Sequence, residues 1–379
     1  MKIYDGTHQT PNYINDGIKF VSVENISNLE GTNKYISKDD YDKDFKIKPE
    51  INDVLMTRIG DIGTPAIIDT NENYAYYVSL ALLKSNQEIL FPKFFIQRIL
   101  SESFQHELWK RTLHVAFPKK INKNEIGECN VFICSKSEQE KIASFLTLLD
   151  KQIEKQKELV ELLKKYKRGL LFSIFSQKLR FKDNNGNDYP DWTEKTLGEV
   201  TDNISYGLNA ASKKFDSKNK YIRITDIDET TGKYNNLDIV SPDCVLSDEY
   251  KLKINDLLFA RTGASTGKTY LYNENDGKMY FAGFLIKFSI NEEYYSNFIF
   301  YITQTFKYKK WVSIMSTRSG QPGINAKEYS KYKFPCPVYN EQVKISNIIS
   351  KIDIIIEKAN ILLDFYNDYK KGLLQKMFI

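Results

Sequence analysis

The chain is poor in the residues from which metal sites and disulfide frameworks are built. Its 379 residues include 4 Cys and 3 His, and no two cysteines form a C-x-x-C pair. Metal ligands usually recur at such short spacings, so we expect no metal site. So few cysteines, none of them paired, are typical of a reducing, cytoplasmic compartment. We recognise no secretory leader in the sequence and no apolar run as long as a membrane span, so we expect no membrane-spanning segment.

Motifs of nucleotide chemistry are missing as well. Adjacent prolines occur nowhere, so the Asn-Pro-Pro-Tyr type of amino-methyltransferase motif is absent. No G-x-G-x-x-G follows an expected strand. The loop at residues 261–268 approaches the phosphate-binding pattern G-x-x-x-x-G-K-[ST], but Thr262 stands where the pattern requires glycine. Pro242 and Asp243 precede Glu249 and Lys251 at a spacing too short for the usual nuclease signature. We therefore expect a non-catalytic chain that binds no cofactor itself.

The most informative feature that is present is a long internal repeat. Residues 51–55 (Ile-Asn-Asp-Val-Leu) return as 254–258 (Ile-Asn-Asp-Leu-Leu), residues 138–142 return as 341–345, and residues 166–171 return as 369–374, each 203 positions later. A period of this length is the size of a domain rather than of a solenoid repeat. Two related units on one chain suit a ligand with two parts. The net charge of +5 permits DNA as that ligand without requiring it.

Two stretches of the repeat predict long helices. Residues 138–176 contain no proline and one glycine, and their apolar residues alternate at spacings of four and three, as along the seam of a coiled coil. The second copy keeps the same register. The simplest interpretation is an antiparallel coiled coil that acts as a spacer; the alternative is that each helix caps its own unit. The expected seam residues are Ile142, Leu146, Leu149, Ile153, Val160, Leu163, Ile345, Ile349, Ile352, Ile356, Leu363 and Tyr366.

The rest of each copy reads as short alternating strands with turns and a few helices. The predicted fold class is therefore α+β, with two pseudo-repeated mixed α/β domains separated by two long helices. We place the first domain at residues 1–136, the first helix at 137–178, the second domain at 179–339 and the second helix at 340–379. Trp109 and Trp311 are expected to be core anchors of equivalent helices.

Polar loops recur at equivalent places in the two domains and are candidates for DNA contact. Arg58 and Arg261 each follow an apolar strand and stand beside two glycines. Arginine suits phosphate or a guanine edge, and glycine lets backbone approach a ligand. The alternative is a tight turn whose arginine pairs with a neighbouring acid. The predicted DNA-contacting residues are Thr7, His8, Gln9, Thr57, Arg58, Gly60, Gly63, Lys119, Lys120, Ser212, Lys213, Lys214, Arg261, Thr262, Gly263, Ser265, Lys268, Arg318, Ser319 and Gln321.

Taken in order, these marks make the chain resemble the specificity subunits of type I restriction–modification systems. The resemblance rests on Asp5-Gly6-Thr7-His8-x-Thr10-Pro11, on the Asn-Asp-(Val/Leu)-Leu strands followed by Thr57-Arg58-x-Gly60 or Ala260-Arg261-Thr262-Gly263, and on the paired Glu-Gln-x-Lys-Ile helices that close in Tyr-Lys-(Arg/Lys)-Gly-Leu-Leu. It covers essentially the whole sequence.

The resemblance implies that each domain is a target recognition domain for one half of a split double-stranded DNA sequence. The helices would set the gap between the half-sites and dock two modification subunits, which carry the S-adenosylmethionine chemistry. Restriction subunits would add translocation driven by ATP with Mg²⁺. One departure is that residues 179–203, a lead-in to the second domain, have no counterpart before Ile3, so we expect a short N-terminus. The alternatives are a stand-alone or fused restriction endonuclease and a coiled-coil adaptor that binds proteins.

Overall fold

The computed structural model describes residues 1–317 and 323–378, and its contacts divide the chain into two units. Unit 1 comprises Met1–Leu159 and Ala359–Ile379, and unit 2 comprises Val160–Lys358. Each unit therefore contains one globular part and half of each long helix. Arg318, Ser319 and Gln321, which the sequence nominates for DNA contact, lie outside the described residues.

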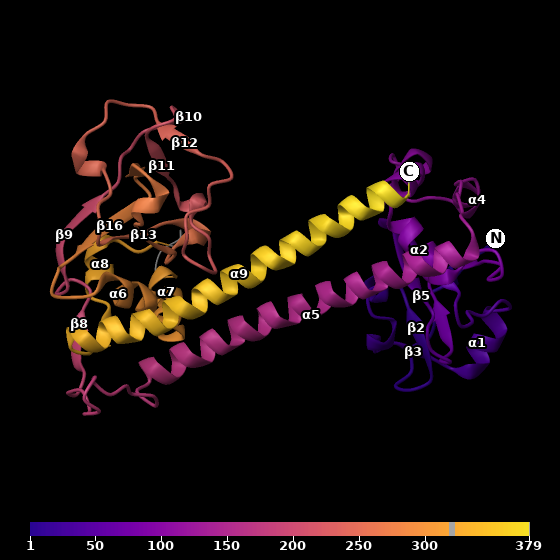
Figure 1. The fold of residues 1–379 in the computed structure, drawn as a ribbon, viewed down its shortest axis with the longest axis horizontal. Helices are drawn as coiled ribbons and strands as arrows, with labels where there is room; N and C mark the ends of the chain where they lie inside the picture. Colours follow the sequence, from indigo (N-terminus) through magenta and orange to yellow (C-terminus); the bar gives the residue numbers. More distant parts are fainter. Residues whose placement is uncertain (318–322, 379) are drawn as a thin grey trace. The chain divides into compact units, whose positions relative to one another are not determined.

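The strands and helices are labelled as in Figure 1. The strands are β1 (Lys2–Asp5), β2 (Ile18–Val21), β3 (Tyr35–Ile36), β4 (Val54–Ile59), β5 (Asp61–Ile67), β6 (Tyr74–Tyr76), β7 (Leu80–Lys84), β8 (Thr193–Thr196), β9 (Thr201–Tyr206), β10 (Ser212–Lys214), β11 (Lys220–Ile222), β12 (Val240–Pro242), β13 (Asp256–Ala260), β14 (Thr269–Leu271), β15 (Met279–Phe281), β16 (Leu285–Ile290) and β17 (Lys333–Cys336). The α-helices are α1 (Lys38–Asp44), α2 (Pro92–Leu100), α3 (Glu102–Arg111), α4 (Lys123–Gly127), α5 (Lys136–Phe175), α6 (Ser296–Thr303), α7 (Phe306–Ser316), α8 (Ala326–Ser330) and α9 (Tyr339–Met377).

The two globular parts are built around sheets of the same strand order. The unit 1 sheet runs β1-β7-β4-β5, and the unit 2 sheet runs β9-β16-β13-β14, with all neighbours antiparallel. Each unit adds a parallel strand pair, β2 with β6 in unit 1 and β11 with β15 in unit 2. The structure thus confirms the α+β class and the internal repeat as a repeat of topology.

The entry into the central strand explains why its sequence recurs. Asn52 and Asn255 adopt the left-handed conformation, with φ of 71° and 70°, which asparagine tolerates better than most residues. The aspartate that follows each of them accepts a hydrogen bond from a backbone N–H three residues earlier, at 2.8 Å in both units. The repeated Asn-Asp is therefore a turn that starts the buried strand.

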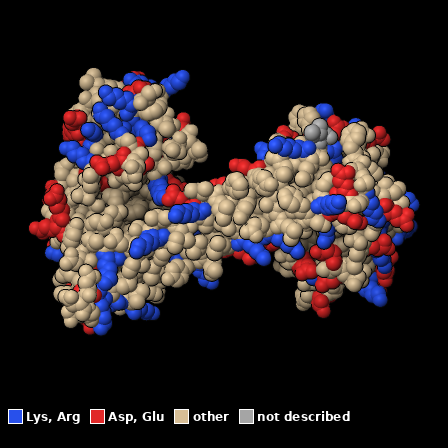
Figure 2. Space-filling model, viewed as in Figure 1, with Lys and Arg blue, Asp and Glu red and all other residues tan. Residues whose placement is uncertain are grey.

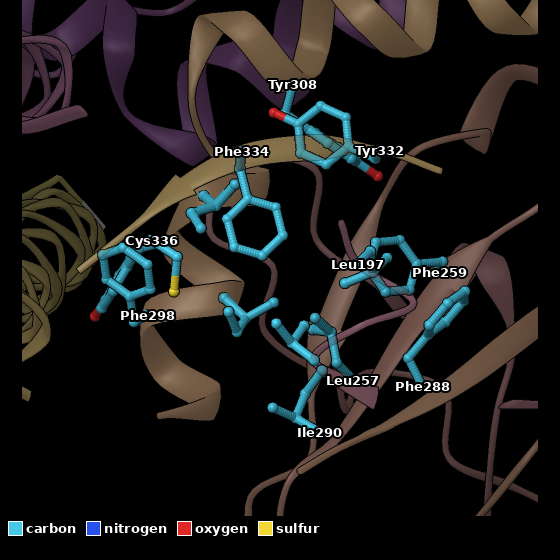
Figure 3. Close-up of a cluster of buried hydrophobic side chains, with 14 of the residues drawn as sticks. Leu197, Leu257, Phe259, Phe288, Ile290, Phe298, Tyr308, Tyr332, Phe334 and Cys336 are labelled. Atoms are coloured by element: carbon cyan, nitrogen blue, oxygen red, sulfur yellow. The ribbon is translucent and has the colours of Figure 1, made fainter. Parts of the chain in front are cut away.

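Apolar side chains from the sheet and the helices form a separate core in each unit. Figure 3 shows the largest cluster of unit 2, in which Phe259 and Phe288 from the sheet face Phe334 from β17. The equivalent cluster of unit 1 joins β4 and β7 to α2, α3 and the nearer ends of α5 and α9. Trp109 departs from the expectation of a core anchor, since it is 60% exposed, whereas Trp311 packs against the unit 2 core.

In each unit, α5 and α9 pack on each other and run in opposite directions (Figure 1). In unit 1, Leu146 shares a core with Leu374, and Asp150 pairs with Lys370. In unit 2, Leu171 shares a core with Ile349, and the Lys167 Nζ lies 2.6 Å from an Asp353 carboxylate oxygen. None of the predicted seam residues is exposed. The antiparallel pairing is therefore confirmed, and the helices begin and end within three residues of their expected bounds. Within the described residues, no helix combines the length and the hydropathy that a membrane span needs.

Candidate nucleic-acid interface

Unit 2 carries an open hollow of about 630 Å³ beside the end of β13. Its lining includes Tyr206, Asn209, Arg223, Arg261 and Phe284. Arg261 follows β13 directly, and its backbone N–H donates to the Phe284 carbonyl at 3.0 Å. The strand therefore delivers this arginine to the wall of the hollow.

The Arg261 guanidinium has donors to spare. It lies over the ring of Tyr206, with 5.0 Å between its central carbon and the ring centroid. Its Nε is buried without a hydrogen-bond partner, and within the described residues it forms no ion pair. A buried donor without a partner costs free energy, so a ligand that accepts this hydrogen bond would gain from it. The aromatic ring holds the cation in place without using its N–H groups.

Arg223 is a second arginine of the hollow, and sequence reasoning did not select it. Its Nε and Nη2 donate to the Asp226 carboxylate at 2.9 and 2.7 Å, and Nη2 also donates to Asp238 at 3.0 Å. The side-chain hydrogen bond with Asp226 is the main cause that raises the pKa of Arg223. This arginine is fixed and balanced by two carboxylates, so Arg261 is the more available donor.

The loop that follows Arg261 borders another hollow, of about 380 Å³. Gly263 and Gly267 have φ of 66° and 90°, and a Cβ at position 267 would come within 2.5 Å of the Val312 side chain. The Lys268 Nζ lies 3.6 Å from Glu229. Thr262 and Ser265 are partly exposed. This loop therefore presents polar side chains on a backbone conformation that requires its two glycines.

The strand β10 presents the other predicted contacts of unit 2. Ser212, Lys213 and Lys214 are all exposed, and the Lys213 Nζ lies 3.5 Å from Asp243. Figure 2 shows lysine and arginine side chains gathered over the region that carries β10, β11 and β12. Among the described residues, no group of three or more His, Cys, Asp or Glu side chains is placed to hold a metal ion.

In unit 1, the residues equivalent to this arginine loop have structural partners within the fold. Arg58 is 7% exposed; its guanidinium pairs with Asp5, and its Nε donates to the Ile121 carbonyl at 3.2 Å. Thr57 is fully buried, and its hydroxyl accepts the Thr64 N–H at 2.9 Å. For Arg58 the structure therefore matches the alternative of an arginine paired with a neighbouring acid.

A single substitution between the copies accounts for the difference between the two arginines. The sheet register places Tyr206 where unit 1 has Asp5, because Asp5 pairs with Ala81 opposite Met56, and Tyr206 pairs with Ile286 opposite Phe259. A tyrosine ring offers no carboxylate, so within the described residues Arg261 lies over the Tyr206 ring and lacks the carboxylate partner that Arg58 has in Asp5. Both arginines keep the same backbone hydrogen bond, from Ile121 N–H or Ile324 N–H to the arginine carbonyl, at 3.0 Å in each unit. The scaffold is therefore shared, while the chemistry of the loop differs.

The exposed polar candidates of unit 1 lie on two other loops. His8 and Gln9 are exposed after β1, and Thr7 fixes that turn through hydrogen bonds of its hydroxyl with the Gln9 backbone, at 3.3 Å. Lys119 and Lys120 are exposed, and the Lys119 carbonyl accepts the Gly60 N–H at 2.8 Å. Gly63 is buried, and it meets Gln105 of α3 instead of solvent.

Exposed apolar residues next to these lysines escaped the sequence analysis. Val115 is 98% exposed and Phe117 is fully exposed, while the exposed Trp109 packs on His114 with 4.8 Å between ring centroids. Aromatic and apolar side chains displayed on a loop beside lysines suit groove contact or base stacking. A signal was present in the sequence, because an aromatic residue directly before a proline and two lysines is an unusual loop composition.

Comparisons with known proteins agree with this organisation. A family model described as "Type I restriction modification DNA specificity domain" matches residues 7–164 and again residues 175–363. The chain is 27% identical over 216 residues to the putative type I restriction enzyme MjaX specificity subunit of Methanocaldococcus jannaschii, a match that covers 54% of this chain and 49% of that protein. It is 23% identical over 262 residues to the type I restriction enzyme StySPI specificity subunit of Salmonella potsdam, covering 66% of this chain and 57% of that protein. The chain thus spans between about half and three fifths of these relatives' length.

A solved structure shares the fold along the full chain. The type I restriction-modification system S subunit from M. genitalium superposes with a TM-score of 0.62 at 17% identity, covering 100% of this chain and 93% of that one. At this identity the likeness concerns the fold alone.

Proposed function

Because this chain belongs to the type I restriction modification DNA specificity family, we propose that it reads a bipartite double-stranded DNA sequence for a modification and restriction complex. The observation that carries the proposal is the repeated sheet with divergent loops. Two units with one topology but different polar loops suit two half-sites of different sequence. The chain itself acts as a targeting subunit without catalysis.

The residues that read DNA would come mainly from the exposed loops. In unit 2, we propose Arg261 as the principal reader, supported by Thr262, Gly263, Ser265 and Lys268 of the same loop. Arginine with free N–H groups is suited to a guanine edge, and lysines suit phosphates. The lysines and serine of β10 would contact the backbone of the same half-site.

In unit 1, the reading surface would be formed by the turn at His8 and Gln9 and by the loop that carries Lys119 and Lys120. Phe117 would add an apolar contact to the bases or to a groove wall. Gly60 would let the backbone approach, because it is exposed with open space around its α-carbon. Arg58 and Thr57 would hold this surface in shape and would not contact DNA.

The paired helices would be the spacer and the docking platform. We propose two modification subunits that bring S-adenosylmethionine, and restriction subunits that bring ATP and Mg²⁺, with no cofactor in this chain. Such an assembly acts on cytoplasmic DNA. A stand-alone nuclease has no support in the described residues, because no cluster of acidic or histidine ligands occurs there. A coiled-coil adaptor that binds only proteins would not explain why Arg261 forms no ion pair within the described residues.

Selection from a random DNA library tests the proposal. The complex of this chain with its modification subunits is bound to random duplexes, and the recovered sequences are aligned. The expected result is two short blocks of fixed sequence separated by a constant gap. Arg261→Ala should make positions in one block degenerate and leave the other block intact. Lys214→Ala is the control, and it should weaken all sequences equally. A single block, or no enrichment, would overturn the proposal.

A further inference from the structure

Unit 2 closes one edge of its core with the segment that follows α5. The strand β8 pairs antiparallel with β17, so that Thr193 stands opposite Cys336 and Thr196 opposite Lys333. Phe334 and Cys336 belong to the core cluster that also contains Leu197, which directly follows β8 (Figure 3). An edge strand and its apolar side chains are thus covered by a single incoming segment.

Residues of the segment that follows α5 also stabilise a buried carboxylate, that of Glu341. Glu341, in the first turn of α9, is fully buried. Arg180 Nε and Nη2 donate to its two oxygens at 3.0 and 3.2 Å, and Trp192 Nε1 donates to one of them at 3.0 Å. A buried carboxylate requires such charge-assisted partners. Residues 180–196 therefore supply an arginine, a tryptophan and a strand to one receiving surface, which is formed by β17 and Glu341.

Unit 1 contains the same receiving surface. The repeat places Glu138 at the position of Glu341, and residues 130–133 at the position of β17. The adjoining glutamines confirm the correspondence, because Gln139 Nε2 donates to the Cys134 carbonyl and Gln342 Nε2 donates to the Pro337 carbonyl, at 2.9 Å in both units. The local scaffold is therefore formed in unit 1 as it is in unit 2.

In unit 1, in the part of the chain that the structure describes, no segment covers this surface. Glu138 is exposed and, within the part of the chain that the structure describes, forms no ion pair. Residues 130–133 form no strand and no bridge there. Phe132 and Ile133 are 70% and 46% exposed, whereas Cys336, the counterpart of Ile133, is buried. Val131, the counterpart of Phe334, is half-buried against the unit 1 core. Unpaired backbone beside exposed apolar side chains is the arrangement that strand addition uses.

We propose that residues 130–138 of unit 1 are a docking surface for an extended polypeptide segment with the chemistry of residues 180–196. The segment pairs antiparallel with residues 130–133 and brings an arginine and a tryptophan to Glu138. The occupant is identified by the chain's own second unit, in which the same elements are already joined. The proposal concerns protein docking and does not depend on DNA reading.

A labelled synthetic peptide of residues 179–197, titrated against the full-length chain and followed by fluorescence anisotropy, tests it. Saturable binding is expected. Glu138→Gln in the protein and Arg180→Ala in the peptide should each weaken the affinity at least tenfold, and together no further, because they remove the same ion pair. Glu140→Gln, which changes a neighbouring exposed glutamate of α5, should leave the affinity unchanged.

Hydrogen exchange then locates the peptide. Slower exchange of the backbone amides at residues 130–133 is the expected result. Slower exchange confined to residues 333–336 would mean that the peptide has replaced β8 in unit 2, and it would overturn the proposal. Absence of saturable binding, or equal binding to the Glu138→Gln protein, would overturn it as well.

Discussion

Gln156 of α5 donates a hydrogen bond from its Nε2 to the carbonyl of Ala359 in α9, at 2.8 Å, and the two residues are 203 positions apart. They are therefore the same position of the two repeats. Both residues belong to unit 1, so this contact joins α5 to α9 within that unit. Gln156 lies near the middle of α5, and Ala359 lies near the middle of α9.

Two ion pairs follow from the same relation. Asp150 pairs with Lys370 in unit 1, and Lys167 pairs with Asp353 in unit 2. Asp353 is the repeat equivalent of Asp150 (150 + 203), and Lys370 is the repeat equivalent of Lys167 (167 + 203). Polar pairs inside an apolar seam fix the register of a coiled coil. These two equivalent Lys–Asp ion pairs therefore fix the register of α5 against α9 in both units.

The first prediction concerns these pairs. Lys167→Met should lower the free energy of unfolding by about 1–3 kcal/mol, because a mostly buried Asp353 loses its charged partner. Lys370→Met, the matched control, should cost less, since the Asp150 side chain is 38% exposed and the Asp353 side chain 27%. Denaturant unfolding measures both. A larger loss of unfolding free energy for Lys370→Met than for Lys167→Met would contradict this ranking of the two ion pairs.

The second prediction separates the two arginines. Arg58→Ala should destabilise unit 1 by about 2–4 kcal/mol, because it leaves Asp5 without its partner and opens a cavity. Arg261→Ala should change stability by less than about 1 kcal/mol and should weaken specific DNA binding by about 1–3 kcal/mol. Thermal unfolding and DNA titration of the two variants decide it. Equal destabilisation by both would show that Arg261 also has a structural role.

The third prediction concerns the turn before the central strand. Asn52→Gly should leave stability unchanged or raise it slightly, because glycine adopts the left-handed conformation freely. Among the described residues, the side chain of Asn52 makes one hydrogen bond, an exposed one to Gln87 at 3.2 Å. Asn52→Val should cost about 1–2 kcal/mol. Chemical denaturation compares the two. If valine were tolerated as well as glycine, the positive φ would not be required.

The fourth prediction concerns thiol reactivity. Burial raises the pKa of Cys336 to about 12 and that of Cys129 to about 11, so both stay protonated at pH 8, where an alkylating agent needs the thiolate. Cys244 is exposed and should react first. Because the folded pKa values are raised, both thiols favour the folded state below pH 9, and this contribution is lost as pH rises towards 12. Mass spectrometry after timed alkylation checks the order, and early modification of Cys336 would contradict it.

The sequence predicted the elements whose pattern is local or repeated. The seam of α5 is predictable because its apolar residues recur at fixed spacing. The repeat then predicts the same seam on α9. The pairing of Arg58 with Asp5 was left open, because it joins residues 53 positions apart in sequence and depends on how β1 and β4 fold. The exposure of Trp109 was missed for a related reason: an aromatic residue on an expected helix predicts burial, and only the fold shows which face of α3 is covered.

The most direct test of the account is a map of modified bases in host DNA, made with this chain present and with it deleted, while the modification subunits are retained. The account predicts a methylated motif of two blocks with a constant gap, which disappears on deletion. Restoring the chain with Arg261→Ala should return the motif with relaxed sequence in one block only. A map that is unchanged by deletion, or a motif of one continuous block, would contradict the claim that the two units read two half-sites.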